Sequence, residues 1–195
     1  MRLTALPSAV IVIVVCAASS SVGAQPVRRA SNSATLFAAG LTGNQWEDVF
    51  TPTELTFRDT YLAGLGISHR FATVFGKLDF EVMGQTALHF GHAHQWEFDV
   101  AAVARWTYFP WNDVVRTSFA FGVGPSYETQ TPPEEIALHG KSPQWLGFWM
   151  AEITAGPPDS AWSGVLRLHH RSTTFGLFGK NGGSNWLALG VQRTF

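Results

Sequence analysis

Apolar and polar residues alternate along most of this chain. Side chains of a β-strand point to opposite faces in turn, so alternation with a period of two predicts strands. In the segment 95–109, Trp96 and Phe98 share one face. Glu97 and Asp99 share the opposite face. The same pattern predicts eight strands, with approximate spans 34–43, 58–70, 73–88, 95–109, 114–128, 146–156, 161–173 and 185–195.

Charged residues of these segments lie opposite the aromatic and aliphatic ones. The predicted interior holds Lys77, Arg105, Arg116, Arg167 and Arg171, together with Asp79, Glu81, Glu97, Asp99 and Glu152. Balanced charges suit a narrow polar lumen, because an unpaired buried charge is costly. A soluble lipocalin-like barrel is the alternative, but it would carry its apolar residues inside. The pattern therefore favours an all-β fold, an eight-stranded antiparallel transmembrane β-barrel whose interior is filled by side chains.

The predicted connections alternate in length. Short turns are expected near residues 71–72, 110–113 and 157–159, and long loops at 44–57, 89–94, 129–145 and 174–184. Short periplasmic turns and long extracellular loops are typical of the bacterial outer membrane, and they would put both termini in the periplasm. Phe195 ends a strand in which apolar residues alternate. This ending resembles the C-terminal signal that the barrel-assembly machinery recognises. Arg193 departs from that form, at a small cost if it lies near the membrane interface.

The first residues have the features of a secretory signal peptide. Arg2 precedes a short apolar run at 9–18, and small residues at 22–24 allow cleavage before Gln25. We therefore expect a signal peptide at 1–24, a periplasmic lead-in at 25–33 and a barrel at 34–195. A lipoprotein signal at Cys16 is the alternative.

Composition narrows the class further. The expected mature chain has no cysteine and therefore no disulfide. No later apolar run is long enough for a membrane-spanning helix. The formal net charge of −1 offers no electrostatic basis for binding nucleic acid.

One candidate for chemistry lies in the seventh predicted strand. His170 and Ser172 are two residues apart and continue the apolar face, whereas Arg167, His169 and Arg171 take the opposite face as lumen residues. A serine hydroxyl is a weak nucleophile that needs a neighbouring base. The pair therefore fits a nucleophile and a general base facing lipid. The alternative is an interfacial histidine beside a strand-end hydroxyl.

The segment from His170 to Ser172, followed by the glycine-rich turn and the last strand, resembles the outer-membrane lipid A 3-O-deacylase family. The resemblance implies a barrel that hydrolyses an ester-linked acyl chain of lipid A in lipopolysaccharide, with Ser172 as nucleophile and His170 as base. It implies no metal or cofactor. The position of the family's acid falls on Asn185 by strand parity, so this chain has an amide there. Glu134 or Glu135 in a neighbouring loop is a possible substitute acid.

Other features of the family pattern also differ. The residues after the serine are Thr173 and Thr174 rather than the usual asparagine and alanine. An inactive or altered relative, serving as a structural, adhesion or envelope-integrity barrel, is therefore the alternative function. Lys141 and Lys180 in the predicted extracellular loops are candidates for contact with lipid A phosphates.

Three further histidines, His89, His92 and His94, fall near a predicted loop. His92 and His94 could present two imidazoles to a metal ion. No carboxylate or thiolate completes such a site by local spacing, so we expect loop histidines without a metal.

Overall fold

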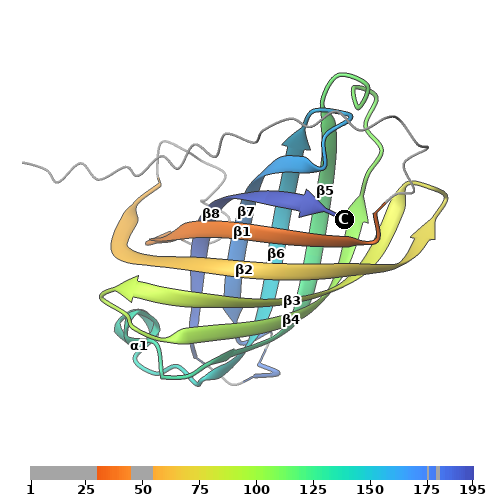
Figure 1. The fold of residues 1–195 in the computed structure, drawn as a ribbon. Helices are drawn as coiled ribbons and strands as arrows, with labels where there is room; N and C mark the ends of the chain where they lie inside the picture. Colours follow the sequence, from red (N-terminus) through yellow and green to blue (C-terminus); the bar gives the residue numbers. More distant parts are fainter. Residues whose placement is uncertain (1–29, 45–54, 175, 179–180) are drawn as a thin grey trace, which may run out of the picture.

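A computed structural model describes residues 30–44, 55–174, 176–178 and 181–195. The expected signal peptide, the start of the lead-in and Lys180 lie outside these residues, and they stay predictions. Within the described residues eight strands form one closed antiparallel barrel, in which β1 pairs with both β2 and β8 (Figure 1). The strands are β1 (Asn32–Thr42), β2 (Phe57–Val74), β3 (Leu78–Gly91), β4 (Trp96–Trp106), β5 (Arg116–Glu128), β6 (Trp145–Gly156), β7 (Trp162–Ser172) and β8 (Gly183–Thr194). The predicted fold class is confirmed.

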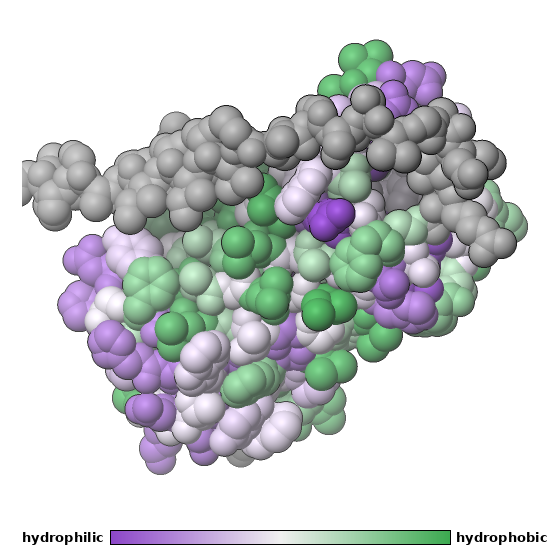
Figure 2. Space-filling view, in the orientation of Figure 1, coloured by the Kyte–Doolittle hydropathy of each residue, from purple (hydrophilic) through white to green (hydrophobic). Residues whose placement is uncertain are grey.

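The two faces of the wall are those predicted from the alternation. Trp96 and Phe98 of β4 are 46% and 47% exposed on the outside, whereas Glu97 and Asp99 are 0% and 2% exposed inside. Figure 2 shows hydrophobic side chains over the middle of the visible wall, with hydrophilic residues toward its ends. The barrel thus has an apolar outside and a charged inside, which is the arrangement of outer-membrane barrels. The described helix is too short to cross a bilayer.

Salt bridges fill the interior. Arg105 Nε donates to Glu81 Oε1 at 2.8 Å, and Arg105 Nη2 lies 3.0 Å from Glu152 Oε1. Arg167 Nε donates to the other oxygen of Glu152 at 2.9 Å. Arg171 Nη1 donates to Glu128 Oε1 at 2.5 Å. Paired charges of this kind hold the lumen closed with side chains, as the narrow barrel requires.

Of two further predicted lumen cations, Lys77 lies outside the lumen, whereas Arg116 lines the interior at one end of the barrel. Lys77 is in the β2–β3 turn, where its Nζ lies 4.1 Å from the centre of the Tyr108 ring. Arg116 is half-buried at the barrel end and donates to Ser163 Oγ at 2.9 Å. The sequence prediction was wrong for Lys77 because it misplaced this turn.

The β2–β3 turn was predicted at 71–72, but β2 continues to Val74. Phe75 and Gly76 have φ of 53° and 66°, and the Lys77 N–H donates to the Val74 carbonyl at 3.1 Å. Two residues with positive φ and this bond form the type I′ hairpin turn that suits the twist of a sheet. Gly76 is the residue that permits it.

Two predicted loops also differ from the structure. β3 runs to Gly91, so His89 belongs to a strand and points inward, and the β3–β4 connection is shorter than expected. The loop between β5 and β6 contains a short helix, α1 (Pro133–His139), which the alternation did not predict. Gly140 ends α1 with φ of 75° and donates to the Ile136 carbonyl at 2.7 Å. In Figure 1, α1 lies at the opposite end of the barrel from the C-terminus.

Candidate functional site

The three candidate residues come together on β7 and β8. The register pairs His170 with Asn185 across these strands, and pairs Ser172 with Gly147 of β6. Arg167, His169 and Arg171 are buried inside the barrel, as predicted, so His170 and Ser172 belong to the outer face. The site lies at the end of the barrel that carries the long loops, called here the long-loop end.

Asn185 orients the His170 ring. The distance from His170 Nδ1 to Asn185 Oδ1 is 2.6 Å. Asn185 Nδ2–H donates to the backbone carbonyl of Asn44 at 3.0 Å, which directs the amide oxygen toward the histidine. Because an amide oxygen can only accept, Nδ1 of His170 carries a proton, and in the neutral ring the lone pair is then on Nε2. This is the tautomer that a general base needs.

An indole ring covers the histidine. The Trp149 and His170 rings are 4.6 Å apart between centroids with planes tilted by 34°. His170 is 9% exposed, so most of the imidazole is shielded from solvent. A base held between an amide and an indole has little rotational freedom.

The Ser172 hydroxyl begins a tight turn. Ser172 Oγ accepts a hydrogen bond from the Thr174 backbone N–H at 3.3 Å. Within the described part of the chain no hydrogen bond joins this hydroxyl to His170. Thr174 has φ of 47°, a strained value for a residue with a branched side chain. Strain of this kind persists only where the surroundings hold it, and here Gly147 leaves the space that the Thr174 side chain fills.

The two glutamates proposed as substitute acids take other roles. Glu134 Oε1 accepts from Thr60 Oγ1 at 3.0 Å. Glu135 is buried inside the barrel, where its Oε1 accepts from Arg171 Nη1 at 2.8 Å. The structure therefore gives no support to either as the third member, and the residue in contact with His170 Nδ1 is Asn185. Lys141 is exposed.

Among the described residues, two groups of buried side chains have donor atoms close enough to hold a metal ion. They are His89 with Glu97 and Glu128, and Glu97 with Asp99 and His169, each with its donor atoms within 4.8 Å. In the structure the histidines bind Glu97 directly, at 2.8 Å from His89 Nε2 and 2.7 Å from His169 Nε2. These groups therefore form a hydrogen-bonded cluster around Glu97, in which His89 Nδ1 and Asp99 Oδ1 have no hydrogen-bond partner among the described residues. His92 and His94 are exposed, and His89 has turned inward away from them.

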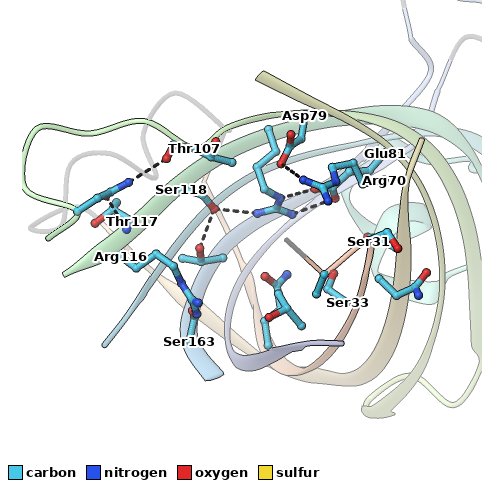
Figure 3. Close-up of a pocket in the computed structure, with 18 of the residues that line it drawn as sticks. Ser31, Ser33, Arg70, Asp79, Glu81, Thr107, Arg116, Thr117, Ser118 and Ser163 are labelled. Atoms are coloured by element: carbon cyan, nitrogen blue, oxygen red, sulfur yellow. Dashed lines mark hydrogen bonds and ion pairs between the residues drawn. The ribbon is translucent and has the colours of Figure 1, made fainter. Parts of the chain in front are cut away.

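A polar hollow lies at the other end of the barrel (Figure 3). Its volume is about 370 Å³, and hydroxyl side chains such as Ser33, Ser68 and Ser118 contribute to its lining. Figure 3 shows Arg70 beside Asp79 at one side and Arg116 against Ser163 at another. The cations and anions here already have partners, and the hollow holds no base beside a nucleophile of the kind found at His170.

No protein-family model and no curated protein sequence matches this chain. Among solved structures, one titled as the crystal structure of the outer membrane enzyme PagL matches with a TM-score of 0.59 and 15% sequence identity. The match covers 83% of this chain and 99% of the other. At this identity the likeness establishes a shared barrel fold.

Proposed function

We propose that this chain is an outer-membrane ester hydrolase that removes an ester-linked acyl chain from lipid A. Ser172 is the nucleophile, His170 the general base and Asn185 the residue that holds the base. The observation that carries the proposal is the hydrogen-bonded series from Asn44 through Asn185 to His170, which sets the proton on Nδ1. A likeness in fold to an outer-membrane enzyme agrees with it.

The reaction follows from these groups. Ser172 Oγ attacks the ester carbonyl carbon while His170 Nε2 takes the hydroxyl proton. The Thr174 N–H, which donates to Ser172 Oγ in the structure, is the proposed donor to the oxyanion that forms beside this oxygen. When the tetrahedral intermediate collapses, the imidazolium returns its proton to the sugar alkoxide, and the acyl group stays on Ser172. A water molecule, deprotonated by His170, then attacks the acyl-serine ester in the same way. This step releases the fatty acid and restores the Ser172 hydroxyl.

An amide can serve as the third member here. In serine proteases, replacing the aspartate by asparagine costs about 10⁴ in turnover, chiefly because the histidine takes the wrong tautomer. The Asn44 carbonyl removes that cause, since it binds Asn185 Nδ2 and leaves only the oxygen for His170. What the amide lacks is a negative charge to stabilise the imidazolium. We therefore expect a slower enzyme with the same steps, as in enzymes that use cysteine, histidine and asparagine.

The outer face of the barrel suits a lipid substrate. His170 and Ser172 lie on the face that carries the apolar belt, so lipid A can reach them by moving sideways within the membrane. Lipopolysaccharide is thus the proposed substrate and the barrel-assembly machinery the proposed partner during insertion. The proposed location is the outer membrane of a Gram-negative bacterium, with the long-loop end outside the cell.

Mass spectrometry of lipid A provides the first test. Outer membranes that contain this chain are expected to carry lipid A lacking one acyl chain, and membranes with Ser172→Ala are expected to carry the intact form. Barrel assembly is checked for both proteins by the heat-dependent shift of folded barrels on gels. Identical lipid A from two well-folded proteins would contradict the hydrolase and favour the non-catalytic barrel.

A second test addresses the turn behind Ser172. A Cβ added at Gly147 would overlap the Thr174 hydroxyl oxygen. We expect Gly147→Ala to displace the turn and to slow deacylation by about tenfold or more, as displacements of about 1 Å do in active sites. Gly164→Ala is the matched control, because its nearest contact is 3.7 Å from the Ala155 carbonyl. If the two variants deacylate lipid A at equal rates, the Thr174 N–H takes no part in the mechanism.

A further inference from the structure

The loop between β5 and β6 folds into the long-loop end and brings one carboxylate inside the barrel. α1 lies within this loop, and its Glu135 is 1% exposed. The neighbouring Glu134 binds Thr60 of β2 instead. His139 at the end of α1 lies with Nε2 3.2 Å from the Gly183 carbonyl at the start of β8. The loop thus contacts the walls on several sides of the barrel mouth.

Glu135 binds both strands that carry the candidate site. Its Oε1 accepts from Arg171 Nη1 at 2.8 Å and from Ser184 Oγ at 2.9 Å, and its Oε2 accepts from Ser142 Oγ. Arg171 and Ser184 are cross-strand partners in the β7–β8 register. Arg171 stands between His170 and Ser172, and Ser184 directly precedes Asn185. One carboxylate therefore holds the pair of residues behind the three proposed catalytic groups.

Two glycines lead into β8, and their backbone conformation favours an anchoring contact such as that of Glu135. Gly182 and Gly183 precede Ser184 with φ of 114° and 139°, conformations that only glycine adopts readily. Glycine loses more conformational freedom on folding than other residues, so a side-chain contact next to these glycines helps to fix the start of the strand. Arg171 has a second carboxylate partner, because Glu128 accepts from the same guanidinium nitrogen at 2.5 Å. The contact that Glu135 makes and Glu128 does not is the one with Ser184 of β8.

We propose that Glu135 is a positioning residue, which acts from inside the barrel to hold Asn185 and His170 in register on the outside. This role rests on the proposed function. The loop between β5 and β6 is then a working part of the enzyme, and the site is complete only when Glu135 is seated between Arg171 and Ser184.

Kinetics on the full chain test the role. With lipid A in detergent micelles, Glu135→Ala is expected to lower kcat by about 10- to 100-fold while KM changes less than about twofold, the signature of an effect confined to the transition state. Glu135→Gln is expected to recover most of kcat, because an amide oxygen still accepts from Ser184 and Arg171. Glu134→Ala is the matched control and is expected to behave as the parent. Labelling of Ser172 by a fluorophosphonate, which needs the activated serine but no lipid, is expected to slow in parallel with kcat.

Two results with the glutamate variants would overturn the role of Glu135. They are an unchanged kcat in Glu135→Ala, whether or not KM changes, and a fall in the kcat of Glu134→Ala of the same size. If Glu135→Ala does not assemble, Ser184→Ala decides, since it removes the β8 contact and keeps the carboxylate beside Arg171. A parent chain that neither deacylates lipid A nor takes the label overturns the proposed function, and this role falls with it. An active parent with an unaffected Ser184→Ala overturns the role of Glu135 alone.

Discussion

Replacement of His170 by alanine is expected to slow lipid A deacylation by about 10⁴-fold or more, because the base and the serine of such a site act as one unit. The imidazole is held by Asn185 on one side and Trp149 on the other, so its removal takes away the proposed base. The measurement is the initial rate of fatty acid release from lipid A in detergent micelles. His92→Ala is the control, since His92 is an exposed histidine at the same end of the barrel.

A double-mutant cycle makes the result specific to the proposed arrangement. Asn185→Ala alone is expected to reduce the rate, since the imidazole loses the acceptor at 2.6 Å that sets its tautomer. In the His170→Ala background the same change is expected to have almost no further effect, because Asn185 acts only through the histidine. Additive losses would mean that Asn185 supports the barrel rather than the base.

Replacement of Glu152 by leucine is expected to lower the free energy of unfolding by about 3–5 kcal/mol, the usual consequence of breaking a buried ion pair. Glu152 is fully buried and lies between Arg105 and Arg167. Arg105 would keep Glu81, but Arg167 would keep the neutral Gln85 oxygen at 2.8 Å and the Phe37 ring at 4.7 Å, neither of which carries a negative charge. An uncompensated guanidinium would then remain in the lumen. Denaturant titration of the barrel in lipid vesicles gives the measurement.

Asp113→Asn is the control for this effect. Asp113 is exposed in the β4–β5 connection, where a change of charge is screened by water. We expect its variant to unfold within about 0.5 kcal/mol of the parent. A Glu152→Leu variant as stable as Asp113→Asn would mean that the lumen charges do not determine the stability of the barrel.

The barrel could be predicted because its signal repeats at every second residue. β4 is an example: Trp96 and Phe98 point outward, and Glu97 and Asp99 point inward, as alternation predicts. The β2–β3 turn was predicted at 71–72, where the β2–β3 register shifts at an irregularity between Arg70 and Ala72, whereas the hairpin turn itself lies at Phe75 and Gly76. α1 was missed because a helix of seven residues is shorter than the windows in which helical periodicity can be recognised.

Part of the candidate site also follows from parity. Counting from the last strand put Asn185 on the face of His170, and these residues are cross-strand partners in the structure. The contacts that shape their chemistry come from farther along the chain. Asn44, Trp149 and Glu135 reach the site only through barrel closure, strand register and the folding of a loop. No local pattern in the sequence carries that information.

The amide of Asn185 has a consequence for how deep the site can lie in the membrane. An ionised carboxylate on the outer wall would have to be removed from water when lipid covers it, and charges become more costly toward the bilayer midplane. A neutral amide whose oxygen and nitrogen are both hydrogen-bonded carries little of that cost. A site of this composition can therefore act on bonds nearer the hydrocarbon than one built around an acid. In the proposed hydrolase, the amide stabilises the imidazolium less than a carboxylate would. In exchange, the site could reach esters over a wider range of depths in the membrane.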